Sequence, residues 1–218
     1  PAMLMALGLP LPKKVFAHGW WTVEGEKMSK SLGNVVNPVE LAHQYGTDPV
    51  RAFLFREVPF GQDGDFSMTS FKNRYNSDLA NNIGNLLSRT LNMAAKNVGD
   101  LPEKAGEGTQ TLARAQETEK AIDGFYKELA FDKVLESIYA FAGDLNKLVD
   151  EKKPWELAKT DKAAAAAVLL ELVCGLRFIA KWTEPFMPTV AAEMQRRLAP
   201  GPIQKYPPLF PRLEEDKK

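Results

Sequence analysis

Residues 70–97 read SFKNRYNSDLANNIGNLLSRTLNMAAKN, a long amphipathic stretch. Its apolar side chains recur at intervals of three and four residues, at Phe71, Tyr75, Leu79, Ile83, Leu86, Leu87 and Met93 or Ala94. This spacing is typical of a helix that buries one face against a core. The stretch therefore predicts the first helix of a helical bundle, and this bundle decides the fold class.

The sequence beyond residue 97 continues the helical character. A polar loop at 99–108 is followed by helical patterns at about 111–129, 131–151, 154–159, 163–181 and 185–198. Helices joined by connections this short favour an antiparallel bundle. We expect the proline-rich end, residues 202–218, to lie over this bundle.

The most apolar of these helices, at about 163–181, has nearly the length of a membrane span. It contains Glu171, Arg177 and Lys181. Each charged residue costs roughly 2.5–3.5 kcal/mol at the centre of a bilayer. A buried bundle helix explains the pattern better, so we expect no membrane partner.

The residues ahead of the bundle have a mixed character. They predict a helical tail at 1–8 and short strands at 15–17 and 20–23. So few strands cannot make a sheet of their own, and we expect their neighbours to lie in sequence that is absent here. The predicted fold class is therefore mainly α: an antiparallel helical bundle, residues 67–218, preceded by a small α/β remnant, residues 1–66.

Two further helices are expected within that remnant. Asn37 can cap a helix whose first residue is Pro38, and Gly46 can end it. A second helix opens at Asp48 and runs to about Arg56. A turn-rich connector, residues 59–67, joins the second helix to the long amphipathic stretch.

Composition narrows the classes of protein that fit. The 218 residues contain 28 Lys or Arg and 28 Asp or Glu, so net charge gives no reason to expect nucleic-acid binding, which must then come from local placement. Cys174 is the only cysteine, which excludes an internal disulfide and fits a reducing compartment. We expect it to be a buried, inert thiol. Asp63 and Asp65 lie in a glycine-rich turn, where we expect solvated carboxylates, and we predict no metal site within the chain.

A short loop ahead of these helices carries the clearest chemical signal. Residues 26–34 read EKMSKSLGN, with two lysines and two serines within five positions. Lysine ammonium groups can follow charge that moves between phosphoryl oxygens, and hydroxyl and backbone N–H groups add neutral donors. The loop therefore predicts a phosphate site, with a solvated surface turn as the alternative.

A second signal lies on the long helix. Asn81, Asn85 and Arg89 are spaced four residues apart and form one stripe, opposite the apolar face. Amides and a guanidinium suit the reading of unstacked single-stranded bases. The alternative is a solvated helix face, but asparagine is a poor interior helix former, so the asparagines in this helix need a reason.

A partner for this stripe is predicted at Lys153-Pro154-Trp155. Proline fixes a helix start there, where unpaired N–H groups favour phosphate. The adjacent Trp155 can stack on a base, or it can pack on the bundle as an ordinary apolar side chain.

These motifs together resemble the methionyl-tRNA synthetase family. Residues 27–31, KMSKS, are the lysine-serine signature of class I aminoacyl-tRNA synthetases. Residues 85–89 and 153–155 look like the two anticodon-reading elements of the methionine family. The likeness covers nearly the whole chain and extends to residues 18–20, 31–34 and 45–51.

The resemblance implies an ATP-dependent ligase of the cytoplasm that activates methionine and passes it to tRNA(Met), with Mg²⁺ expected beside ATP. It implies catalytic roles for Lys27 and Lys30. It assigns ATP binding to Lys27, Met28, Ser29, Lys30 and Ser31, and anticodon binding to Asn81, Asn85, Arg89 and Trp155. It places His18 at the edge of the active site, with a structural hydrogen-bonding role as the alternative.

One signature of the family has no counterpart here. The His-x-Gly-His element, which binds the adenine nucleotide, is absent because the only histidines are His18 and His43. We therefore expect the carboxy-terminal half of such an enzyme, inactive without its N-terminal catalytic half. Two alternatives remain open: a non-catalytic tRNA-binding helical module, and a class I synthetase for another amino acid.

Overall fold

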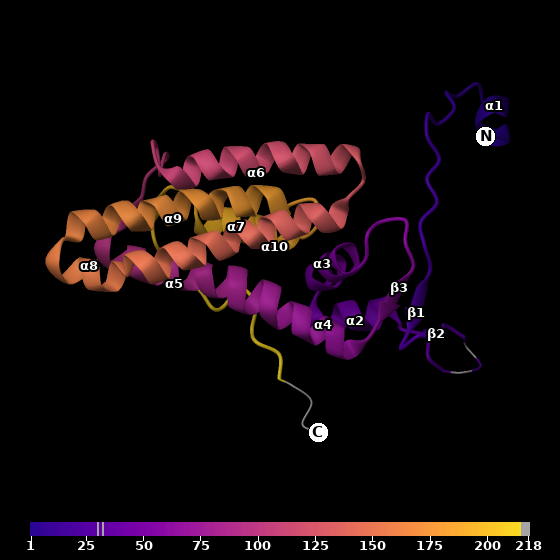
Figure 1. Ribbon diagram of the computed structural model, residues 1–218, viewed down its shortest axis with the longest axis horizontal. Coiled ribbons are helices and arrows are strands. Elements are labelled where there is room, and N and C mark those ends of the chain that lie inside the picture. The colour runs from indigo at the N-terminus through magenta and orange to yellow at the C-terminus, as the bar shows by residue number, and fades with distance from the viewer. Residues whose placement is uncertain (30, 32, 215–218) are drawn as a thin grey trace.

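The computed structural model describes residues 1–29, 31 and 33–214, and its described part is mainly helical (Figure 1). The bundle is built from α5 (Asn85–Asn97), α6 (Gln110–Lys127), α7 (Phe131–Lys152) and α9 (Lys162–Thr183). Two shorter helices, α8 (Pro154–Thr160) and α10 (Pro188–Arg197), pack against α9. The predicted fold class, a mainly α protein with an antiparallel bundle behind a small α/β part, is confirmed.

The long amphipathic stretch folds as one continuous helical rod with three parts. These are α4 (Met68–Arg74), the π-helix η1 (Tyr75–Gly84) and α5. The apolar positions predicted from periodicity are buried, and Ile83, Leu86 and Leu87 have no exposed surface. The π-helical middle was not predicted. The apolar residues keep a spacing of three and four residues through this segment, so periodicity does not distinguish a π-helix from an α-helix there.

Helix α9 lies at the centre of the bundle. It packs against α5, α6, α7, α8 and α10. Close approach to α7 depends on Gly175, because a Cβ atom there would stand 2.6 Å from Leu145 Cδ1. Cys174 beside it is buried as expected, and burial raises the pKa of its thiol. Within the described residues α9 alone has the length and apolar composition of a membrane span, and half of its apolar window is buried inside the bundle.

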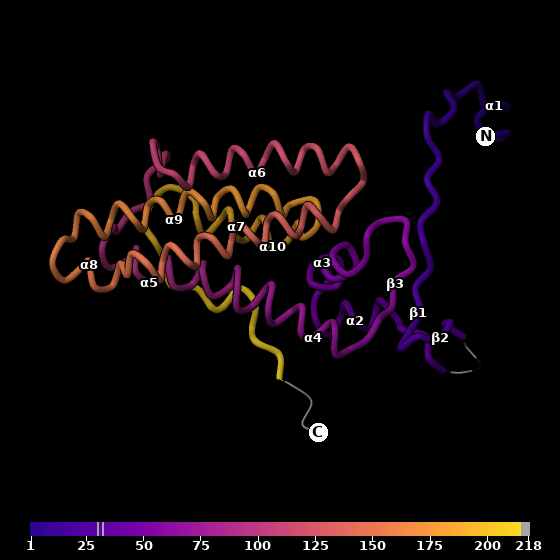
Figure 2. The backbone as a smooth tube through the Cα atoms, in the orientation of Figure 1, coloured from indigo at the N-terminus to yellow at the C-terminus, as the bar shows by residue number. Residues whose placement is uncertain are grey.

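The N-terminal part contains a three-stranded sheet, so the expectation that its strands have no sheet of their own is wrong, since the chain itself supplies β1 with two neighbours. Strand β1 (Trp21–Val23) pairs antiparallel with β2 (Glu26–Lys27) and parallel with β3 (Gly64–Phe66). The strand predicted at 15–17 is wrong, because these residues find no pairing partner in the described chain and Val15 is 82% exposed. Helix α1 (Ala2–Ala6) and the extended segment after it lie away from the bundle (Figure 2).

The two helices predicted after the lysine-serine loop are confirmed. Helix α2 (Pro38–Tyr45) is capped by Asn37, whose Oδ1 accepts a hydrogen bond from Val39 N–H at 3.0 Å. Helix α3 (Thr47–Glu57) follows directly after Gly46, whose φ of 91° reverses the chain. Together they form the layer between the small sheet and the rod, as Figure 1 shows.

Helix α10 begins three residues later than predicted. The predicted start at Pro185 is wrong because residues 184–186 form a turn, in which Phe186 and Met187 N–H groups donate to Thr183 O. Arg51 from α3 then donates to the carbonyl oxygens of Pro185 and Phe186, each at 2.9 Å. These carbonyls are therefore committed to α3 and do not enter a helical ladder.

The described part of the C-terminal tail, residues 202–214, lies over the bundle, as predicted. Asn76 in η1 donates from Nδ2 to Leu213 O at 3.0 Å and accepts from Leu213 N–H at 2.9 Å. Phe210 is buried and packs edge-on against Tyr75. A two-residue pair of strands, β4 (Asp100–Leu101) and β5 (Gly201–Pro202), holds the start of this tail.

A buried carboxylate joins the N-terminal part to α10. Asp48 is 5% exposed, and its Oδ2 accepts a hydrogen bond from Val190 N–H at 2.7 Å, in the first turn of α10. Because no residue of α10 caps this end with its own side chain, Asp48 acts as its cap from a distant part of the sequence.

We predict that Asp48→Ala lowers the free energy of unfolding by about 1–2 kcal/mol, the usual cost of losing a helix cap. Asp48→Asn keeps an acceptor oxygen and should lose less. Urea unfolding of the 218-residue chain followed by circular dichroism measures both. Equal stability of wild type and Asp48→Ala would contradict this role.

Candidate functional site

The anticodon-reading candidates lie where α5 meets α8. The Arg89 guanidinium stands over the Trp155 ring, with its central carbon 5.7 Å from the ring centroid. Arg89 also forms an ion pair with Asp150 of α7 at 3.4 Å. Arg89 and Trp155 therefore come together as expected, although 66 positions separate them in the sequence.

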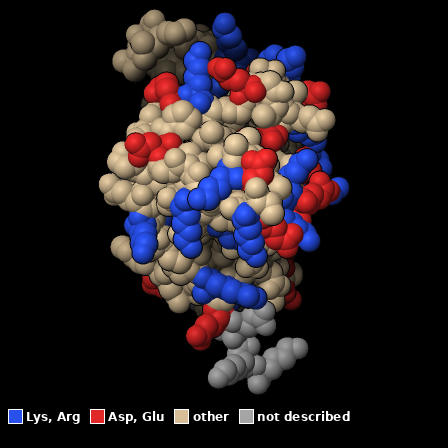
Figure 3. Space-filling view, turned by 90° about the vertical axis from the view of Figure 1, so that its left-hand side faces the viewer, with Lys and Arg blue, Asp and Glu red and all other residues tan. Residues whose placement is uncertain are grey.

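These side chains face solvent. Trp155 is 39% exposed, and Asn81 and Asn85 on the preceding turns of the rod are exposed as well. Figure 3 shows the end of the molecule that carries α8, where Lys and Arg side chains spread across the middle of the face. This arrangement can offer a stacking ring, amides and positive charge to a polyanion.

The orientation of Trp155 follows from the joint between α7 and α8. Lys153 adopts a left-handed conformation with a φ of 43°, which turns the chain between the two helices. Pro154 then begins α8 and is buried, so the helix start is fixed while the next side chain points outward. The sequence predicted this start from the proline.

Two of the asparagines on the rod have structural reasons to be there. Asn76 holds the chain end, as described above, and Asn82 Nδ2 donates to Tyr139 O of α7 at 2.9 Å. Asn146 of α7 in turn donates to Asn82 Oδ1 at 2.9 Å. The hydrogen bonds that occupy Asn76 and Asn82 are internal, which separates them from the exposed Asn81 and Asn85.

The lysine-serine loop follows the β1–β2 hairpin. Asp65 in β3 accepts hydrogen bonds from Thr22 Oγ1 at 2.6 Å and Gly25 N–H at 2.8 Å, and these bonds lower the pKa of its carboxyl. Asp63 accepts from Trp20 N–H at 2.7 Å. Both carboxylates are exposed, as expected, and each also accepts a hydrogen bond from a backbone N–H group next to β1.

The loop itself places its hydroxyl and ammonium groups at the surface. Lys27 is exposed, Met28 and Ser29 are half-buried, and Ser29 Oγ lies 2.7 Å from the exposed Ser31 Oγ. Lys30, the other predicted catalytic lysine, lies outside the described residues, as does Leu32. The described part of the loop has the donors that a phosphate needs.

A hollow of about 620 Å³ opens beside this loop, between it and the segment before β1. It is lined by His18, Gly19, Trp20, Trp21, Thr22, Lys27 and Met28. His18 Nδ1 lies 2.8 Å from Gly19 O, and its ring stacks on Phe60 at 6.2 Å. His18 therefore lies at the hollow that the lysine-serine loop borders and also makes a local polar contact.

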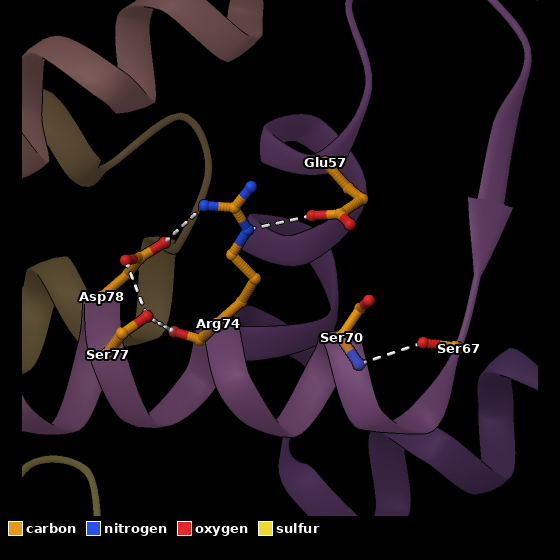
Figure 4. A network of polar contacts seen from close by, with 6 residues as sticks. All are labelled: Glu57, Ser67, Ser70, Arg74, Ser77 and Asp78. Atoms are coloured by element: carbon orange, nitrogen blue, oxygen red, sulfur yellow. Dashed lines mark hydrogen bonds and ion pairs between the residues drawn. The ribbon is translucent and has the colours of Figure 1, made fainter.

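The two candidate sites are joined by the rod, and a polar network fixes its start. Arg74 Nε donates to Glu57 of α3 at 2.9 Å, and Arg74 also pairs with Asp78 at 3.7 Å (Figure 4). Burial disfavours the Arg74 charge, but these two carboxylates outweigh it and hold the pKa of Arg74 above its usual value. Ser67 caps the rod by accepting from Ser70 N–H at 3.0 Å.

Sequence reasoning missed three residues of these sites. Asp150 pairs with Arg89, Asp65 pins the hairpin, and Asn34 hydrogen-bonds within the loop. Nothing in the local sequence marks Asp150 among the other charges of α7. In the part of the chain that the structure describes, no group of three or more His, Cys, Asp or Glu side chains could hold a metal ion.

A lysine-serine loop beside an open hollow, followed by a helical bundle that presents Arg89 and Trp155, is the arrangement that the resemblance to a class I aminoacyl-tRNA synthetase led us to expect. A family model described as "tRNA synthetases class I (M)" matches residues 1–91, and one described as "Anticodon binding domain of methionyl tRNA ligase" matches residues 101–208. The chain belongs to the methionyl-tRNA synthetase family. This family match decides against the alternative of a class I synthetase for another amino acid.

Similar proteins carry the same name. The methionine–tRNA ligase of Caldanaerobacter subterraneus subsp. tengcongensis is 48% identical over 204 residues, which cover 91% of this chain and 32% of that protein. The methionine–tRNA ligase of Clostridium acetobutylicum is 40% identical and aligns with all of this chain and 37% of its own. The chain therefore spans about a third of the length of these curated relatives.

Solved structures agree in fold. The free form of Mycobacterium tuberculosis methionyl-tRNA synthetase superposes with a TM-score of 0.84 at 34% identity, covering 99% of this chain and 47% of that one. The same enzyme in complex with methionyl-adenylate gives a TM-score of 0.83 at 39% identity, covering 97% and 47%.

We predict that Trp155→Ala changes the free energy of unfolding by no more than about 1 kcal/mol, because the ring is partly exposed and its main loss is one cation–π contact. Trp182→Ala is the matched control, since Trp182 is 4% exposed. That substitution should cost about 3–5 kcal/mol. Comparable losses for both variants in urea unfolding would show that Trp155 is a core side chain.

Proposed function

We propose that this chain is the carboxy-terminal part of a methionine–tRNA ligase, an enzyme that activates methionine with ATP and transfers it to tRNA(Met). Residues 1–66 would complete the catalytic domain, and residues 67–218 would form the anticodon-binding domain. The observation that carries the proposal is the contact between Arg89 and Trp155. Arg89 lies in α5, the last part of the rod, and Trp155 lies in α8. The other end of the rod leads back toward the lysine-serine loop. Family membership and a solved relative in complex with methionyl-adenylate support it.

In the proposed reaction, the methionine carboxylate attacks the α-phosphorus of ATP, and the bond from that phosphorus to the bridging oxygen breaks to release pyrophosphate. The tRNA terminal ribose hydroxyl then attacks the methionyl carbonyl and releases AMP. Lys27 and Lys30 neutralise charge that develops on the leaving pyrophosphate, with Mg²⁺ accompanying ATP. Met28, Ser29 and Ser31 supply backbone and hydroxyl donors, and His18 borders the hollow.

Anticodon recognition would use the exposed surface at the other end of the rod. Trp155 offers a ring for stacking, and Arg89, Asn85 and Asn81 offer donors and acceptors to base edges. Such a reaction belongs in the cytoplasm, where tRNA and ATP are supplied. The non-catalytic tRNA-binding module remains the second candidate, since the chain contains no His-x-Gly-His element.

We predict that Trp155→Ala weakens binding of tRNA with a CAU anticodon by about one to two orders of magnitude, because a stacked base is worth about 1–3 kcal/mol. Binding titrations of the 218-residue chain with CAU and scrambled anticodons measure this. Gln116→Ala is the control, because Gln116 is exposed on α6, a helix that packs on α7 and α9 and not at the junction of α5 and α8. Equal weakening of both tRNAs by Trp155→Ala would contradict base reading.

We also predict that the 218-residue chain alone shows no methionine-dependent exchange of pyrophosphate into ATP. In the full-length protein that contains it, Lys30→Ala should lower kcat for exchange about 100- to 1000-fold with a much smaller change in the KM for ATP. Full-length protein that binds tRNA(Met) but catalyses no exchange would favour the non-catalytic module.

A further inference from the structure

The side chain of Asn34 bridges the two ends of the lysine-serine loop. Its Oδ1 accepts a hydrogen bond from Ser29 N–H at 2.8 Å, and its Nδ2 donates to Lys27 O at 3.2 Å. Gly33 brings Asn34 back toward Lys27, with a φ of 67° that side chains rarely tolerate. Asn34 thus joins two described residues at the start of the loop, Lys27 and Ser29, to the residue after Gly33.

This closure needs an amide. An amide side chain carries a donor and an acceptor on one carbon, so it can satisfy an N–H and a C=O group together. The two backbone groups it engages flank Met28, a residue that lines the hollow. A carboxylate at the same place would accept from Ser29 N–H but would oppose the Lys27 carbonyl oxygen.

The bridge acts inside the loop, whereas Asp65 fixes the hairpin from outside. Asp65 reaches only Thr22 and Gly25, which precede the loop. Without Asn34, Lys27 keeps its strand pairing with Thr22, and the described residues after it keep the contact between the Ser29 and Ser31 hydroxyls. That contact does not join the loop to either of its ends.

We propose that Asn34 is a positioning residue, which ties the lysine-serine loop closed and so fixes where Lys27 and Ser29 stand at the edge of the hollow. The closure itself is a property of this chain. Its consequence for catalysis rests on the proposed function, because only a reaction at the hollow would depend on where these groups stand.

The closure is tested on the 218-residue chain with a lysine-specific endoprotease. Cleavage of the Lys27–Met28 bond requires the chain to open around Lys27 O, which Asn34 holds. Two net hydrogen bonds are lost in Asn34→Ala, so cleavage at this bond should be about tenfold faster. Asn34→Asp keeps the acceptor and should give an intermediate rate. Mass spectrometry identifies the bond that is cut.

Asn92→Ala is the matched control, the same substitution at an exposed asparagine of α5, and it should be cut at the wild-type rate. Circular dichroism should show equal thermal stability for all variants, since the bundle is untouched. Cleavage of Asn34→Ala at the wild-type rate would overturn the proposal.

The positioning role is tested in the full-length protein by pyrophosphate exchange. Asn34→Ala should lower kcat at least tenfold with the KM for ATP changed by less than about threefold, because charge stabilisation of the transition state needs placed groups. Wild-type kcat in this variant would overturn the catalytic part of the proposal. A wild-type protein without exchange activity would refute the proposed function instead, and the protease result would still decide whether Asn34 closes the loop.

Discussion

Parallel pairing of strand β1 with strand β3 is the constraint on which the arrangement of both candidate sites depends. The register sets Thr22 opposite Asp65 and Val23 opposite Phe66. Because alternate residues of a strand face opposite sides, Phe66 enters the core while Asp65 points outward to hold the hairpin. Phe66 packs edge-on against Phe53 of α3, so a three-residue strand connects the loop to the helices.

Strand β3 also fixes the direction of the rod, because the rod begins at Met68, two residues after the strand ends. Ser67 caps the first turn, and Arg74 ties the rod to Glu57 at the end of α3. The buried apolar side chains form one contiguous core, whose members range in sequence from Leu41 to Phe210. The lysine-serine loop and the Arg89–Trp155 surface are therefore anchored to opposite ends of one packed body, and the rod sets the spacing between them.

The sequence predicted what local patterns encode. Periodicity identified the bundle helices, caps identified α2, and Pro154 identified the start of α8, whereas the exposure of Trp155 stayed open until the structure was known. Contacts between distant residues were out of reach: Asp65 and Gly25 are 40 residues apart, and Arg51 and Phe186 are 135 apart. The strand expected at 15–17 failed for the same reason, since apolar alternation shows strand propensity but not whether a partner strand is present.

The two candidate sites differ in how far the protein has organised them in advance. An indole has two faces, and Arg89 covers one of them while Asp150 offsets part of its charge. Under the proposed function, a base that stacks on Trp155 would take the remaining face or replace Arg89, and an Arg89 released in this way could form hydrogen bonds to the base edge. The lysine-serine loop differs, because two hydrogen bonds of one amide, Asn34, join Lys27 and Ser29 to the residue after Gly33, so we expect the placement of its proposed phosphate-binding groups to change when these bonds are lost.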